Sequence, residues 1–214
     1  SRKNEEIKGC KQVININERE KIREAIQTSD FLFHLCAIID PYDKDIEKIN
    51  LGFTKFLVSE SKKIKNFIFL SSQNVLFDND DLYTKTKREG EEMVRKLKNH
   101  VIIRPTIIYG PGDYRYIGKL IKYIANHKIV PIVGNGENIL QPIYIQDLTL
   151  FVDMCTTKNI NGTFLLAGKS RVSYNQLVEM IIEKIGVQKK LVHIPIPILK
   201  PIIYAGEKIT KKIP

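Results

Sequence analysis

The sequence predicts an α/β fold: a doubly wound, mostly parallel sheet with a smaller, interleaved C-terminal lobe. First, short runs rich in Ile, Val and Phe alternate with segments whose apolar residues recur at helical spacing. Second, these apolar runs are continuous, as in strands that are buried on both faces. Third, Gly and Pro cluster after residue 105, where the alternation loosens. A chain of 214 residues is long enough for one sizeable core with a smaller lobe beside it.

The first half of the chain has the pattern of repeated strand and helix. Strands are expected at 12–16, 31–35, 67–71 and 101–105. Helices are expected between them, at 18–27, 43–64 and 84–98. This order makes successive strands parallel and places helices on both faces of the sheet.

In the second half of the chain, strand-like and helix-like segments alternate less regularly. Helical patterns lie near 114–127, 146–156 and 173–186, a strand-like run at 163–167, and a Pro-rich stretch at 193–209. We therefore expect a first domain over residues 1–108, with part of 143–167, and a lobe that comprises most of 109–214. The lobe should cover the carboxyl ends of the strands, where open α/β sheets bind their ligands.

Composition narrows the class of protein. The net charge is +10, but the lysines are spread along the chain, which favours a solvated surface over a nucleic-acid-binding one. Cys10, Cys36 and Cys155 are far apart and form no CxxC, so neither a disulfide framework nor a zinc site is indicated and a cytoplasmic setting fits. The N-terminus is charged where a signal peptide needs an apolar core, and no stretch reaches about 18 apolar residues, so no membrane span is expected.

One feature of dinucleotide-binding sheets is missing. Such a sheet normally opens with a strand, a Gly-rich turn and a helix whose N-terminus holds the pyrophosphate. Here the first glycine is Gly9, alone in "EIKGCK". Either this is not such a protein, or the opening β-α-β unit of roughly 30 residues is not part of these 214.

The stretch "FIFLSSQNVLFDNDDLYTKTK" carries the candidate chemistry. It places Ser71 and Ser72 at the carboxyl end of a buried strand, followed by Tyr83 and Lys87, which share a helix face if a helix begins near Leu82. An ammonium group beside a phenol favours the phenolate, as a general acid/base requires, and a nearby serine can hold the substrate oxygen. The alternative interpretation is an ordinary pair on a helix surface.

These residues resemble the extended and atypical short-chain dehydrogenase/reductases, the group that contains NAD-dependent epimerase/dehydratases and nucleotide-sugar epimerases. The serine strand and "YTKTKREGE" match the catalytic motifs of that family. The resemblance implies a Rossmann-like fold and a catalytic set of Ser72, Tyr83 and Lys87.

Other motifs extend the resemblance over nearly the whole chain. "SDFLFHLCAI" is similar to the D-x-V-x-H-x-A-A strand, "INLGFTKFLVSES" to the N-x-x-G-T helix and "VIIRPTIIYGPGD" to the R-P-x-x-x-Y-G-P-G loop. Asn50 and Thr54 keep their places in the helix motif, but its glycine is Gly52 instead of residue 53. For His34 the residues alone favour a satisfied strand-end ring over a proton shuttle.

The resemblance also implies ligand contacts. Cofactor contacts would come from Arg2, His34, Leu35, Ala37, Ser71, Tyr83, Lys87, Pro105 and Ile107. Substrate contacts would come from Gln73, Arg104 and Gln141, although packing of the 130–142 loop is an equal alternative for Gln141. The cofactor would be NAD or NADP, and Arg2 with Lys3 favours NADP because a basic residue there accepts the 2′-phosphate. No metal is implied.

Two functions follow from the resemblance. The first is an NAD(P)-dependent epimerase, dehydratase or reductase that acts on a hydroxyl or keto group of a small molecule such as a nucleotide sugar. The alternative is a non-catalytic NADPH-binding member that serves as an assembly subunit, because the loop between serine and tyrosine is short and Leu140 and Gln141 stand where many relatives have arginine. The resemblance further suggests a homodimer through the helices near 44–64 and 84–98.

Overall fold

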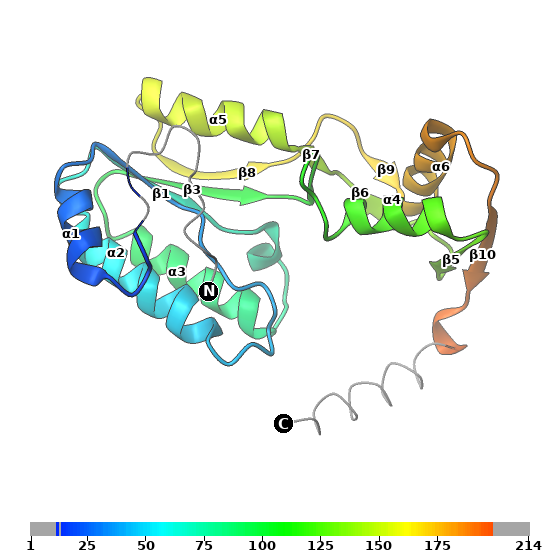
Figure 1. Cartoon of the computed structure of the whole chain (residues 1–214), viewed down its shortest axis with the longest axis horizontal. Coiled ribbons are helices and arrows are strands. Elements are labelled where there is room, and N and C mark those ends of the chain that lie inside the picture. The colour runs from blue at the N-terminus through cyan, green and yellow to red at the C-terminus, as the bar shows by residue number, and fades with distance from the viewer. Residues whose placement is uncertain (1–11, 13, 199–214) are drawn as a thin grey trace. The chain divides into compact units, whose positions relative to one another are not determined.

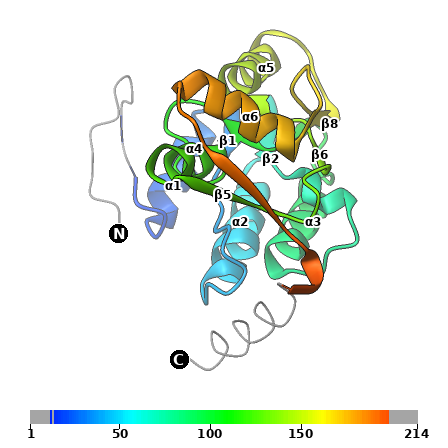
Figure 2. The same cartoon turned by 90° about the vertical axis from the view of Figure 1, so that its right-hand side faces the viewer.

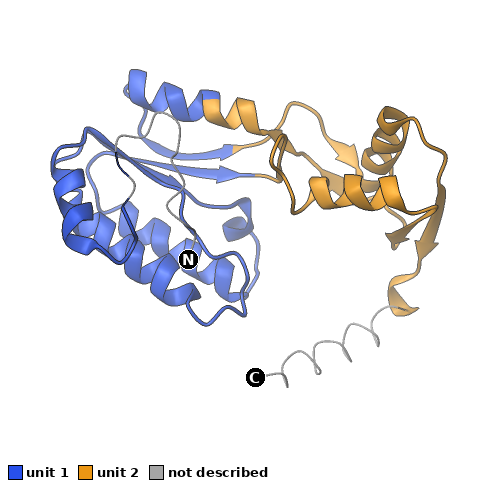
Figure 3. Cartoon of the chain, viewed as in Figure 1, with its two compact units in different colours: residues 1–105, 150–165 blue, residues 106–149, 166–214 orange. Residues whose placement is uncertain are grey.

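The computed structural model describes residue 12 and residues 14–198. The chain forms two compact units: residues 1–105 with 150–165, and residues 106–149 with 166–214 (Figure 3). The chain thus leaves the first unit after Pro105 and returns to it at Leu150. The division expected from the sequence, with a first boundary at residue 108, differs from this boundary by three residues.

The first unit alternates strands and helices along the chain, as Figure 1 shows. Its elements are α1 (Arg19–Gln27), β1 (Phe31–His34), the π-helix η1 (Lys48–Phe53), α2 (Thr54–Glu60), β2 (Asn66–Leu70), the 3-10 helix η2 (Gln73–Leu76), α3 (Leu82–Val94), β3 (His100–Pro105), the second half of α5 (Ile145–Thr157) and most of β8 (Gly162–Leu166).

These strands form one sheet in the order β1-β2-β3-β8, in which β1 pairs with β2 and β2 with β3 in parallel register. The helices α1, α2 and α3 lie on one face, and the part of α5 in this unit lies on the other (Figure 1). Both faces are therefore covered, and the first four residues of β2 are buried. This explains why the two central strands have continuous apolar sequences.

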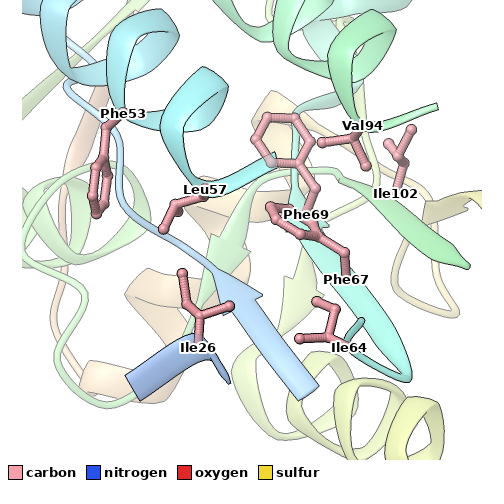
Figure 4. Packing of buried hydrophobic residues seen from close by; sticks show 8 residues of the cluster. All are labelled: Ile26, Phe53, Leu57, Ile64, Phe67, Phe69, Val94 and Ile102. Atoms are coloured by element: carbon pink, nitrogen blue, oxygen red, sulfur yellow. The ribbon is translucent and has the colours of Figure 1, made fainter. Parts of the chain in front are cut away.

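The core of the first unit lies between the sheet and the helices on one face. Eight buried residues form it, contributed by α1, η1, α2, β2, α3, β3 and the turn before β2: Ile26, Phe53, Leu57, Ile64, Phe67, Phe69, Val94 and Ile102 (Figure 4). Gly90 lets α3 approach this core closely, because a Cβ there would lie 2.9 Å from Cζ of Phe69. The helix that carries Tyr83 and Lys87 is thereby held against β2, the strand that the two serines follow.

In the residues that the structure describes, the second unit has short strands and two longer helices of its own. Its elements are β4 (Ile108–Tyr109), α4 (Ile117–Asn126), β5 (Ile129–Val133), β6 (Ile139–Leu140), β7 (Ile143–Tyr144), the first half of α5, β9 (Val172–Ser173), α6 (Tyr174–Ile185) and β10 (Lys190–Ile194). The strands form three pairs: β5 with β10 and β4 with β7 are parallel, and β6 with β9 is antiparallel. In Figure 2 the β5–β10 pair crosses in front of α4 and α6, and Val130 of β5 packs in one core with residues of both helices.

One expectation about the elements was wrong. The described residues of the expected strand 12–16 form no strand. Local hydrogen bonds of Asn15 with Glu18 and Asn17 close a turn there, and such bonds compete with strand pairing. Ile16 still packs on the core through its side chain. The helix expected over 43–64 is one continuous helical stretch over residues 46–60, in which the π-helical segment η1 precedes α2.

Candidate active site

The predicted serines follow β2 directly, and the predicted tyrosine and lysine lie on the first turns of α3. This helix begins at Leu82 because Asp81 caps it: Oδ1 of Asp81 accepts the backbone N–H of Thr84 at 2.9 Å. Tyr83 and Lys87 are therefore one turn apart on the same helix. Tyr83 is half-buried.

Lys87 is not a surface lysine. Its side chain is 4% exposed, Nζ donates a hydrogen bond to the carbonyl oxygen of Leu70 at 2.7 Å, and Nζ lies 4.8 Å from the ring centroid of Phe69. Burial lowers the pKa of Lys87 to about 8, against the partial compensation of Cys36 and Glu91. The interpretation of Tyr83 and Lys87 as an ordinary surface pair is therefore wrong for the lysine.

The two serines have different environments. Ser71 is 3% exposed, and its hydroxyl donates to Oε1 of Glu91 at 2.6 Å. Ser72 is half-buried, and its oxygen accepts the backbone N–H of Asn74 at 3.2 Å, which leaves the hydroxyl hydrogen free to be donated elsewhere. Ser72, the serine predicted to be catalytic, is thus the more exposed of the two.

His34 ends β1 as a buried, satisfied ring. It is 2% exposed, and its Nε2 lies 2.7 Å from Oγ1 of Thr54. Because Thr54 donates its own hydrogen to the carbonyl oxygen of Asn50 at 2.6 Å, its oxygen accepts from His34 and Nε2 carries the proton. Burial, together with the nearby Lys87 charge, lowers the pKa of His34 to about 3. The ring is therefore neutral at pH 7, which fits a structural role at the end of β1 and not a proton shuttle.

Asn50 links three parts of the first unit. Its side chain exchanges hydrogen bonds with the backbone of Ile38, at 2.8 Å to the N–H and 2.9 Å to the carbonyl, and donates to Oγ1 of Thr86 at 3.0 Å. Thr86 in turn donates to the carbonyl oxygen of Tyr83 at 2.8 Å. The loop after β1, η1 and the start of α3 are therefore tied together at Ile38, and this loop also contains the predicted cofactor residues Leu35 and Ala37.

Arg104 faces a protein carboxylate. Its Nε and Nη2 donate to the two oxygens of Glu91 at 2.8 and 2.5 Å, a bidentate pair. Sequence reasoning assigned Arg104 to substrate and missed Glu91. The available signal was spacing, since Tyr83, Lys87 and Glu91 recur every four residues on one helix face. Gln73 begins η2, and Pro105 is buried at the end of β3.

The remaining predicted residues lie in the second unit or outside the described part of the chain. Gln141 is held by its neighbours: its Nε2 donates to the carbonyl oxygen of Gly168 at 2.6 Å, and Nε of Arg171 donates to its Oε1 at 3.3 Å. Ile107 accepts the N–H of Ile143 at 2.9 Å. Arg2 is outside the described residues.

Within residues 12 and 14–198, no three His, Cys, Asp or Glu side chains gather as a metal site would require. None of the helices described is long and apolar enough to cross a membrane. In this part of the chain, Cys36 is exposed and Cys155 is buried, and both are free thiols.

A helix-covered parallel sheet, with serine at the end of one strand and Tyr-x-x-x-Lys on the next helix, is the arrangement of the NAD-dependent epimerase/dehydratase superfamily. The chain belongs to the family of the RmlD substrate binding domain, whose model matches residues 2–203. The family resemblance and the Rossmann-like fold class expected from the sequence are thus confirmed.

Similar curated proteins include a 3beta-hydroxysteroid-dehydrogenase/decarboxylase of Arabidopsis thaliana, 22% identical over 90% of this chain and 41% of that protein. A dTDP-D-glucose 4,6-dehydratase of Dictyostelium discoideum is 29% identical over 85% of this chain and 47% of its own length. The chain thus spans about half the length of these relatives or less.

Two solved structures share the fold. The UDP-glucuronic acid 4-epimerase of Bacillus cereus in complex with NAD superposes with a TM-score of 0.71 at 24% identity, over 84% of this chain and 68% of that one. The dTDP-4-dehydrorhamnose reductase of Bacillus anthracis in complex with NADP gives a TM-score of 0.72 at 15% identity, over 85% of this chain and 72% of that one.

Proposed function

We propose that the protein is an NAD(P)-dependent enzyme that epimerises, dehydrates or reduces a nucleotide sugar at a hydroxyl or keto group. One observation carries the proposal: Lys87 is a buried cation beneath the end of β2, one turn after Tyr83 and next to the Ser72 strand end. Related proteins named as a dTDP-D-glucose 4,6-dehydratase and a UDP-glucuronic acid 4-epimerase support the substrate class.

The chemistry divides among three side chains. Tyr83 would take or give the proton of the reacting hydroxyl, because a phenol can serve as general acid and base. Lys87 would favour the ionised phenol, since with a pKa of about 8 it keeps its positive charge at pH 7 despite burial. Ser72 would donate its hydroxyl hydrogen to the substrate oxygen. The nicotinamide ring, when bound, would exchange the hydride.

The residues that would hold the nicotinamide end of the cofactor lie in the first unit. They are Tyr83 and Lys87 on α3, Ser71 after β2 and Pro105 at the end of β3. Lys87, whose Nζ already donates to a backbone carbonyl, has further hydrogens to donate to a ribose hydroxyl. The pyrophosphate end would depend on the Gly-rich turn that the superfamily carries and that this sequence does not contain.

The test begins with calorimetric titration of NADH and NADPH into protein made from the complete gene, with the 214-residue chain alongside. Binding by the complete product supports the proposal. The binding protein is then incubated with a panel of nucleotide sugars while cofactor absorbance and product sugars are followed.

Tyr83→Phe should abolish turnover and leave cofactor affinity within about threefold, because only the proton-transferring hydroxyl is lost. Tyr42→Phe is the matched control, since Tyr42 is 76% exposed in the same unit, and it should turn over normally. Unchanged turnover in Tyr83→Phe rejects the catalytic assignment. Cofactor binding without turnover in the unaltered protein, against every sugar, would instead favour the non-catalytic assembly role.

A further inference from the structure

Glu91 is a buried carboxylate at which four hydrogen bonds meet. It lies on α3, one turn after Lys87 and two turns after Tyr83, and is 0% exposed. Oε1 accepts from Ser71 Oγ at 2.6 Å and Arg104 Nε at 2.8 Å. Oε2 accepts from Arg104 Nη2 at 2.5 Å and Arg95 Nη2 at 2.6 Å.

The hydrogen-bond donors stabilise the negative charge of Glu91 in the protein interior. Burial opposes ionisation of Glu91, but the hydrogen bonds from Arg104 and Ser71 and the charges of Arg104 and Arg95 outweigh it, so the pKa lies below its usual value. Arg104 is itself largely buried, with its side chain 19% exposed. Loss of one partner of such a pair leaves an uncompensated buried charge.

The bonds also fasten α3 to β2 at two successive residues. The carbonyl oxygen of Leu70 accepts from Lys87, and the hydroxyl of Ser71 donates to Glu91. Arg104 adds an attachment to β3. These two hydrogen bonds involve helix positions one turn apart and adjacent residues at the end of β2. They therefore fix both the position of α3 along the strand and its rotation about its own axis. The next residue of the chain is Ser72.

We propose that Glu91 is a positioning residue, which holds the helix of Tyr83 and Lys87 in register with Ser72 through its hydrogen bond from the Ser71 hydroxyl. The proposal rests on the catalytic roles proposed above for Ser72, Tyr83 and Lys87. Glu91 does not touch substrate or cofactor in this role. It acts by holding three elements together, so that the serine hydroxyl, the phenol and the ammonium group share one reacting position.

Glu91 also favours the protonated, positively charged form of Lys87. The titratable groups near Lys87 in the described part of the chain include His34 from β1, Cys36 from the loop after it, and both Tyr83 and Glu91 from its own helix. His34 is neutral, and Glu91 helps Lys87 keep its proton. Replacement of Glu91 by a neutral residue should therefore lower the pH at which Lys87 titrates, through the lost charge and through any shift of α3.

The test compares Glu91→Gln with Glu60→Gln. Gln keeps the size of Glu91 but removes the charge. Glu60 makes an ion pair with Arg23 at 3.0 Å in the same unit and is not part of the proposed site, so it controls for the loss of a partly buried ion pair. Thermal unfolding of both variants shows how much stability each change removes.

The first readout needs no activity. The Lys87 ammonium group is titrated by NMR in protein with ¹⁵N-labelled lysine, and its signal is assigned by its loss in Lys87→Met. The midpoint should fall below that of the wild type in Glu91→Gln and stay unchanged in Glu60→Gln. The proposal is overturned if, in Glu91→Gln, the titration midpoint of Lys87 and the amide signals of Ser72 and Tyr83 are all unchanged. This result does not depend on turnover, so it can be distinguished from failure of the proposed function.

The second readout is kinetic. Glu91→Gln should lower kcat by about 10- to 100-fold with cofactor affinity changed less than about threefold, because misplaced groups affect the transition state more than binding. Glu60→Gln should keep kcat within about twofold. A normal kcat in folded Glu91→Gln contradicts the proposal. If Glu91→Gln does not fold, Ser71→Ala removes a single bond to Glu91 and should shift the Lys87 midpoint and kcat in the same direction by less; unchanged values in Ser71→Ala then contradict it.

Discussion

The buried ring of His34 predicts a specific loss of stability in mild acid. Its pKa is lowered from 6.5 to about 3, first by burial and then by the nearby charge of Lys87. A base whose pKa is lower in the folded state contributes stability that is complete above pH 6.5 and lost as the pH falls toward 3, because only the unfolded chain takes up the proton. From these two pKa values the loss between pH 7.5 and pH 5 is about 2 kcal/mol.

The assay is urea unfolding of the wild type and of His34→Gln at pH 7.5, 6 and 5. Gln can still donate a hydrogen bond to Thr54 but cannot titrate, so it costs stability at pH 7.5 through poorer packing yet removes the pH dependence that His34 adds. The difference between the two proteins should shrink by about 2 kcal/mol at pH 5. His127→Gln is the matched control for the chemical change, since it replaces an exposed histidine by the same residue. Equal slopes for wild type and His34→Gln would refute the buried, neutral ring.

Two further predictions concern backbone geometry and capping. Gly118→Ala should destabilise the protein by more than about 2 kcal/mol, because a Cβ would lie 1.7 Å from the carbonyl oxygen of Asp113, whereas Gly52→Ala, with no atom within 4 Å, should be neutral or stabilising in the same thermal unfolding experiment. Ser173→Ala should cost about 1 kcal/mol in urea unfolding, because Ser173 and Gln176 form a capping box at the start of α6; an unchanged midpoint would contradict that role.

Local sequence signals predicted much of the first unit. The continuous apolar runs at 67–71 and 101–105 form β2 and β3, because such runs are stable as strands only when both faces are covered. The helix expected at 84–98 begins two residues earlier, at Leu82, because Asp81 caps it there and a capping residue acts on its immediate neighbours. The prediction of a strand at 12–16 was wrong because hydrogen bonds between neighbouring residues decide the structure there. Asn15 and Glu18 close a turn that the apolar pattern does not reveal.

The tertiary structure decided how charged residues are used. Glu91, Arg104 and Ser71 are far apart along the chain, and sequence patterns in a Lys-rich chain do not distinguish a buried carboxylate from a surface one. Their roles depend on which helix face meets which strand end, because a charge is stable inside a protein only where donors from other elements surround it.

The sequence by itself determined the α/β order, the family, and the serine, tyrosine and lysine that form the candidate site. These features depend on the periodicity of apolar residues and on motifs of a few residues, and both can be read from neighbouring positions in the chain. Only the tertiary structure showed that Lys87 is buried, that the Ser71 hydroxyl donates a hydrogen bond to Glu91 while the Ser72 oxygen accepts a backbone N–H, and that Arg104 faces a carboxylate. Burial and hydrogen-bond partners arise where distant segments pack together, and they decide which of the predicted side chains can act.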